Sequence, residues 1–100
     1  MRISFERSGG FAGIIIKRDF DLDDLPDEVE DSLKEMLKAA KFFDLPPLLS
    51  SHGVVPDSFS YVITVKSDKG EHTVAFSEGE ISDSLRPLVD QLWQMATKRK

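Results

Sequence analysis

Four short segments with the residue pattern of β-strands dominate this 100-residue chain, and they occur in two pairs. Residues 1–7 alternate around Ile3 and Phe5, and residues 13–18 carry the β-branched run Ile14-Ile15-Ile16 after a glycine-rich turn. Alternation with a period of two is typical of strands with one buried face, and a short glycine-containing connection predicts a β-hairpin. The chain therefore opens with a hairpin.

The second pair of segments lies in the C-terminal half. Residues 58–66 and 71–77 flank the turn Asp68-Lys69-Gly70, and each segment places its apolar side chains on one face. These side chains are Phe59, Tyr61, Ile63 and Val65 in the first segment, and Val74 and Phe76 in the second. We expect a second hairpin, in which His72 is a packed or strand-end histidine rather than a metal ligand.

Two further segments have the spacing of amphipathic helices. The first begins at Leu25-Pro26-Asp27-Glu28 and ends near residues 41–43, before Pro46-Pro47. Its apolar face consists of Val29, Leu33, Met36, Leu37 and Ala40. The last helix is capped by Ser82 or Ser84 and tolerates Pro87 in its first turn. Its face consists of Leu85, Leu88, Val89, Leu92 and Met95 or Ala96, flanked by Trp93.

The order of these elements is β-β-α-β-β-α. It predicts an α+β fold, with a four-stranded antiparallel sheet and both helices packed on one face. We expect residues 1–100 to form a single domain, because this length is close to the commonest domain size. Residues 44–57 form the longest irregular segment, which contains three prolines. A connection of this length favours an ordered or functional loop.

Composition excludes several classes of function. The formal net charge of −5 argues against a sequence-independent nucleic-acid surface. The absence of cysteine excludes disulfides and thiolate chemistry. The sequence shows no basic-then-apolar leader and no apolar run that approaches the length of a membrane span. We therefore expect a cytoplasmic protein that is monomeric when free and has no membrane or nucleic-acid partner.

Residues suited to catalysis are few. The two histidines, His52 and His72, are far apart in the sequence and form no metal-binding pair. Carboxylate pairs such as Asp23-Asp24 lie beside the start of the first helix, where they complement its dipole. No nucleophile elbow or phosphate-binding loop is present. We expect no enzyme activity, no cofactor and no metal site.

Binding to another molecule is the class of function that remains. The first candidate binding site is the turn Ser8-Gly9-Gly10-Phe11-Ala12-Gly13. Gly9 and Gly10 permit positive φ angles and leave the backbone bare, so another surface could approach closely. Phe11 is unusual in such a turn. It either folds back onto the core of a plain hairpin or is offered to the pocket of a partner.

The second candidate is the segment from Leu48 to Val55 within the long irregular stretch, with Leu49-Ser50-Ser51-His52-Gly53 as its expected contact residues. Leu48, Leu49, Val54 and Val55 are its apolar residues. Its polar, glycine-containing centre lies between apolar residues. These residues either close the edge of the core or contribute to a binding surface. A second surface is needed for any tight complex, because standard interfaces use roughly 20–30 residues a side.

Five strings of residues, in the same order along nearly the whole chain, share the pattern of a known family. They are Phe5-Glu6-Arg7-Ser8-Gly9-Gly10-Phe11-Ala12-Gly13, Ala39-Ala40-Lys41-Phe42-Phe43-Asp44-Leu45-Pro46, Asp57-Ser58-Phe59-Ser60-Tyr61-Val62-Ile63-Thr64-Val65, Glu71-His72-Thr73-Val74 and Leu85-Arg86-Pro87-Leu88. The ordered set resembles the emfourin family. The run Ile14-Ile15-Ile16 departs from the polar alternation expected there, which affects packing more than membership.

The resemblance implies a protein inhibitor of thermolysin-like zinc metalloproteases, the class that includes protealysin. Such proteases favour a bulky apolar side chain just after the scissile bond. Phe11 would fill that pocket, with the Gly9-Gly10 backbone near the catalytic zinc of the protease. Arg7 to Gly13 and Leu49 to Gly53 are the expected protease-binding residues. The alternative function is a non-catalytic adaptor or assembly module that binds another protein through the sheet or the long loop.

Overall fold

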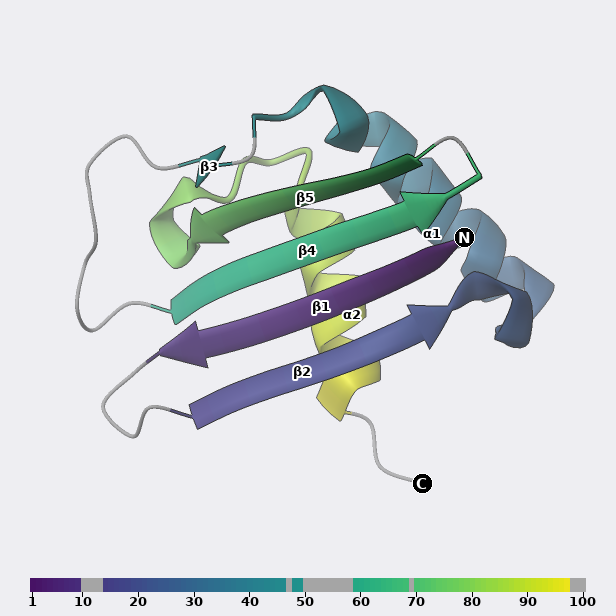
Figure 1. Ribbon diagram of the computed structural model, residues 1–100, viewed down its shortest axis with the longest axis horizontal. Coiled ribbons are helices and arrows are strands. Elements are labelled where there is room, and N and C mark those ends of the chain that lie inside the picture. Colours follow the sequence, from purple (N-terminus) through teal and green to yellow (C-terminus); the bar gives the residue numbers. More distant parts are fainter. Residues whose placement is uncertain (10–13, 47, 50–58, 69, 98–100) are drawn as a thin grey trace.

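The computed structural model describes residues 1–9, 14–46, 48–49, 59–68 and 70–97. Four long strands and two helices follow one another in the order β-β-α-β-β-α, which confirms the predicted α+β fold (Figure 1). The strands are β1 (Arg2–Gly9), β2 (Ile14–Asp21), β4 (Phe59–Ser67) and β5 (Gly70–Ser77), and the helices are α1 (Asp27–Ala39) and α2 (Arg86–Thr97). The shorter elements are strand β3 (Leu48–Leu49) and the 3-10 helices η1 (Leu22–Asp24), η2 (Phe42–Asp44) and η3 (Glu78–Glu80).

The sheet has the strand order β2-β1-β4-β5-β3. Both predicted hairpins are present, as the antiparallel pairs β1–β2 and β4–β5. Antiparallel pairing of β1 with β4 joins the hairpins into one sheet, with Ile3 opposite Val65 and Phe5 opposite Ile63. Strand β3 is an addition to the predicted sheet. Its two residues pair in parallel with β5, within the segment expected to be irregular.

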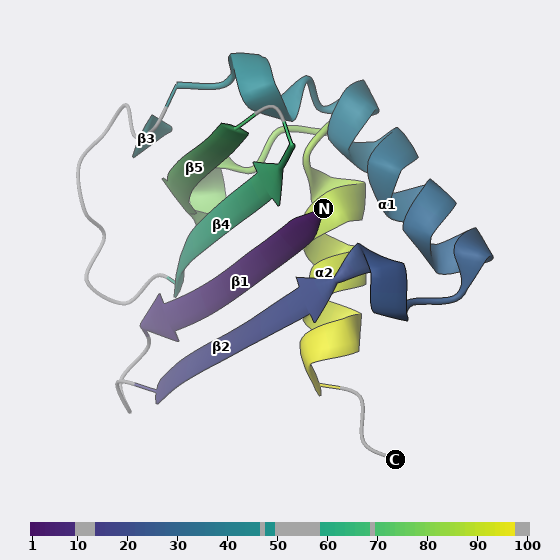
Figure 2. The same cartoon turned by 45° about the vertical axis from the view of Figure 1, so that its right-hand side comes forward.

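Both helices cover the same face of the sheet (Figure 2), as the apolar alternation predicts. Each strand of the two hairpins turns one set of side chains toward them, because successive side chains in a strand point to opposite faces. Ile3, Phe5, Ile63, Val65 and Val74 are buried there. They meet Leu33 and Leu37 of α1 and Leu88, Val89 and Leu92 of α2 in one core. No helix among the described residues is long and apolar enough to cross a membrane.

The ends of the helices follow from local chemistry. Helix α1 starts after Pro26, and Lys41, with a left-handed φ of 51°, terminates it two residues past Ala39. Ahead of α2, the hydroxyl of Ser82 accepts a hydrogen bond of 3.3 Å from the backbone N–H of Leu85. Pro87 lies in the first turn of α2, as predicted. Ser82 is therefore the residue of the two suggested serines that makes this capping bond.

Candidate functional site

One end of the sheet, which we call the turn end, gathers the residues that flank both predicted binding segments. Gly9 at the end of β1 pairs with Ile14 on one side and with Phe59 on the other. Residues 10–13 connect Gly9 to Ile14, and Phe59 is the first described residue after residues 50–58. Leu49 pairs with Phe76 in the neighbouring part of the sheet, where Phe76 also pairs with Tyr61. Both segments therefore leave from and return to the same end of the sheet.

Only part of the predicted site lies among the described residues. Ser8 and Gly9 lie in β1, and the backbone of Leu49 lies in β3. Gly9, the last residue of β1, has a φ of 119°, so this glycine adopts the positive φ that the sequence permits there. Gly10, Phe11, Ala12 and Gly13, and likewise Ser50, Ser51, His52 and Gly53, lie outside the described residues. The direction of the Phe11 side chain stays a prediction.

Arg7, the first of the predicted binding residues, turns toward the helices rather than away from the protein. It follows Ile3 and Phe5 on the same face of β1 and is partly buried. Its guanidinium carbon lies 3.6 Å from the centre of the Phe59 ring and 4.1 Å from the centre of the Trp93 ring. A cation stacked on aromatic faces is attracted by their quadrupoles. Arg7 thus connects β1 to β4 and to α2.

A chain of polar contacts continues from Arg7. Its Nε donates a hydrogen bond of 3.2 Å to the hydroxyl of Tyr61, and that hydroxyl donates to Oε2 of Glu78 in η3. Oε1 of Glu78 lies 4.0 Å from a guanidinium nitrogen of Arg86, at the start of α2. Burial raises the pKa of Tyr61, and the hydrogen bond to Glu78 raises it further, while the bond from Arg7 opposes them. The buried phenol therefore stays protonated and can donate to Glu78.

Tyr61, Phe59, Trp93 and Glu78 form the surroundings of Arg7, and sequence reasoning did not assign them to the site. A signal was nevertheless present. The alternation that buries Ile3 and Phe5, continued for two more residues, places Arg7 on the core face. A charged side chain on a core face requires partners, because its desolvation is costly without them. The sequence alone does not tell which aromatic residues provide them.

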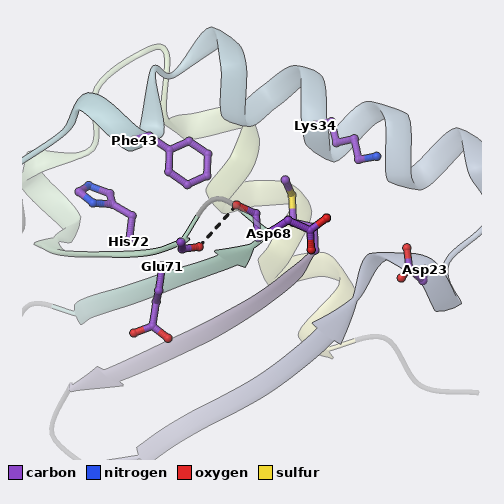
Figure 3. Close-up of a pocket in the computed structure, with 9 residues that line it drawn as sticks. Asp23, Lys34, Phe43, Asp68, Glu71 and His72 are labelled. Carbon is purple, nitrogen blue, oxygen red and sulfur yellow. Dashed lines mark hydrogen bonds between the residues drawn. The ribbon is translucent and has the colours of Figure 1, made fainter.

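A hollow of about 740 Å³ lies at the other end of the sheet, between α1 and the β4–β5 turn (Figure 3). Lys34 of α1 and Asp23 of η1 project toward it from one side, and Phe43 and His72 stand on another. Several of these groups already have partners within the protein. Lys34 pairs with Glu30 at 3.5 Å, and Glu71 pairs with Lys66 at 3.3 Å. The lining of the hollow therefore carries charges of both signs.

His72 is partly buried and packs against its neighbours. Its Nε2 lies 2.8 Å from the carbonyl oxygen of Leu45, so this nitrogen carries the proton and donates. The ring meets Phe42 edge to face, with 5.5 Å between ring centres. This confirms the expectation of a packed histidine. Within the described ranges, no group of three or more histidine, aspartate or glutamate side chains is placed to hold a metal ion.

Comparison with known proteins adds one finding to this geometry. The sequence profile of the Emfourin family matches residues 5–93, a span that includes the Arg7 contacts, all of α1, α2 as far as Trp93 and the turn end of the sheet. No curated protein and no solved structure matches the chain. A match over most of the chain is decisive for membership. The chain belongs to the Emfourin family, a family of protease inhibitors.

Proposed function

We propose that this protein inhibits a thermolysin-like zinc metalloprotease, of the kind represented by protealysin, by inserting the turn end of its sheet into the active-site cleft. The observation that carries this proposal is the pairing of Gly9 with both Ile14 and Phe59. It brings the residues flanking both candidate segments to one end of the molecule. Two adjacent segments can supply the contact area that a single turn lacks.

In this proposal the turn provides the central contact. Phe11 enters the apolar pocket that such proteases use for the residue after the scissile bond, and the Gly9-Gly10 backbone passes near the zinc ion of the protease. The positive φ of Gly9 supports a tight reversal of the chain there. Strands β1 and β2 hold the turn at both ends, so little conformational entropy is lost on docking.

The decisive experiment is a titration of thermolysin-like proteases with the purified protein, in which the remaining activity is measured as the rate of cleavage of a peptide substrate. We expect stoichiometric loss of activity for at least one protease. Phe11→Ala should weaken inhibition by roughly tenfold or more, as removal of a central aromatic anchor does. Phe43→Ala, at the other end of the molecule, serves as the matched aromatic control because Phe43 is 48% exposed.

The outcomes separate the candidate functions. A Phe11→Ala change of less than about twofold would contradict the anchor role. Replacement of residues 50–53 by a short linker tests the second segment. If inhibition and stability are both unchanged, this segment is not part of the interface. No effect of the protein on several thermolysin-like proteases would reject the inhibitor and favour a non-catalytic adaptor.

A further inference from the structure

The guanidinium of Arg7 lies where the two proposed binding segments meet. Arg7 precedes Gly9, at which the turn begins, by two residues. Its guanidinium carbon stacks at 3.6 Å on the ring of Phe59, where the second segment rejoins the sheet. One side chain therefore links the start of the first segment to the end of the second.

Arg7 is also connected to the start of the second segment, through Tyr61 and Phe76. The Tyr61 hydroxyl accepts a hydrogen bond from Nε of Arg7. The Tyr61 ring stacks on Phe76, with ring centres 5.4 Å apart and an angle of 17° between the planes. Phe76 in turn pairs with Leu49, the last described residue before residues 50–58. Three of the four flanking positions, Gly9, Phe59 and Leu49, thus lie beside one cluster of side chains.

Helix α2 and η3 hold this cluster from the other side. The Trp93 ring lies 4.1 Å from the guanidinium carbon of Arg7, so the cation lies against two aromatic side chains from different elements. Glu78 accepts the hydrogen bond that the Tyr61 hydroxyl donates, and its other carboxylate oxygen lies 4.0 Å from Arg86. A planar guanidinium suits this place, because it stacks on rings while its edge donates hydrogen bonds. A lysine ammonium can do only part of this.

We propose that Arg7 is a positioning residue of the inhibitor: it holds Gly9 and Phe59, the residues next to the two proposed protease-binding segments, in a fixed relation without contacting the protease itself. This inference rests on the proposed function. Its physical basis is preorganisation, since a surface already held in its bound geometry loses less entropy on docking. A fixed relation also keeps the segments from adapting to the catalytic groups as a substrate would. Loosening Arg7 should therefore speed both dissociation and cleavage of the inhibitor.

The test compares substitutions at two arginines of the same strand. Arg7→Met keeps the length and apolar stem of the side chain but removes its charge and its hydrogen bond. Arg7→Lys keeps the charge and loses the planar group. Arg2→Met is the matched control, because Arg2 is 58% exposed and its only described ion pair, with Asp21, is a surface pair at 3.7 Å. Melting temperatures of all variants define a temperature at which each is fully folded.

At that temperature, Arg7→Met should raise the dissociation rate of the protease complex about tenfold, since changes within one interface act mainly on dissociation. Arg7→Lys should lie between Arg7→Met and the wild type. Mass spectrometry should show faster cleavage of the bound inhibitor between residues 9 and 13. A role in stability alone would lower the melting temperature and leave both rates unchanged, and that result would overturn the proposal.

Two further readouts complete the test. In double-mutant cycles, Phe11→Ala and the replacement of residues 50–53 should each lose less affinity in the Arg7→Met background than in the wild type, whereas Arg2→Met should be additive. Amide exchange at residues 8–9 and 59–60 should quicken in Arg7→Met but not in Arg2→Met. If the wild type inhibits no protease, the proposed function fails. In that case, amide exchange at residues 8–9 and 59–60 still tests whether Arg7 holds these residues in place.

Discussion

At the scale of single residues, Gly9 has a backbone conformation that restricts which residues can stand at the end of β1. Its φ of 119° lies in a region that residues with a side chain rarely adopt. We expect Gly9→Ala to lower the free energy of unfolding by about 1–2 kcal/mol, since the native conformation becomes strained. It should also weaken protease inhibition, because the turn starts there. Urea unfolding and inhibition assays measure the two effects.

Gly79 in η3 is the control for this prediction. A Cβ added at Gly79 would meet nothing within 4 Å, and its φ is not in the positive region. Gly79→Ala should therefore change the free energy of unfolding by no more than about 0.5 kcal/mol, as an unstrained surface substitution does. Equal losses at the two glycines would contradict the role assigned to the φ of Gly9.

Tyr61 makes the polar contacts of Arg7 accessible to spectroscopy, because it is the only tyrosine in the chain. Burial and the hydrogen bond to Glu78 raise its pKa above the ordinary value of about 10. Alkaline titration of tyrosinate absorbance should therefore give a midpoint above that of free tyrosine. Glu78→Gln should move the midpoint downward, since the carboxylate contributes to the rise. An unchanged midpoint in this variant would contradict the contact.

The raised pKa of Tyr61 also fixes the sign of a pH effect on stability. The folded state holds the phenolic proton more tightly than the unfolded state does. This stabilisation is fully present below the unfolded pKa of about 10 and is lost as pH rises through the folded pKa. Above the unfolded pKa, the wild type should lose stability more steeply than Tyr61→Phe. If the wild type and Tyr61→Phe lost stability equally with rising pH, Tyr61 would make no such contribution.

At the scale of elements, the end of α1 offers an internal comparison. Lys41 adopts a φ of 51° just after the helix, whereas Lys38 lies in the last helical turn, and both are exposed. Lys41→Gly should raise the free energy of unfolding by about 0.5–1 kcal/mol, because glycine removes the left-handed strain. Lys38→Gly should lower it by up to about 1 kcal/mol, because glycine is a much poorer helix former than lysine. Thermal and urea unfolding of the two variants check the opposite signs.

The elements were predictable from the sequence to different degrees. Periodicity predicted the long strands and helices, because burial of one face imposes a repeat of two or 3.6 residues on the sequence. Strand β3 could not be found in this way. Leu48 and Leu49 are too few to show a period, and their pairing depends on the neighbouring edge of β5. The position of Arg7 was implicit in the alternation of β1, but its aromatic partners come from β4 and α2.

At the scale of the whole molecule, the sheet separates two regions with different properties. The turn end carries the residues that flank both proposed binding segments, and the opposite end carries the mixed-charge hollow. One large exposed apolar side chain lies near each end. Ile15 pairs with Ser8 beside the turn and is 66% exposed, while Phe43 in η2 is 48% exposed beside the hollow. Among the described residues these are the large hydrophobic side chains that water reaches most.

This pair tests which end of the molecule meets the protease. Ile15→Glu should weaken inhibition by roughly tenfold or more, because it places a charge on apolar surface next to the docking turn. Phe43→Glu should leave inhibition unchanged within about twofold, since a site outside the interface contributes nothing to it. Inhibition constants measured at one ionic strength, with unfolding curves to confirm that both variants fold, give the comparison. The reverse pattern would move the interface to the hollow end, and the role proposed for Arg7 would then fall with it.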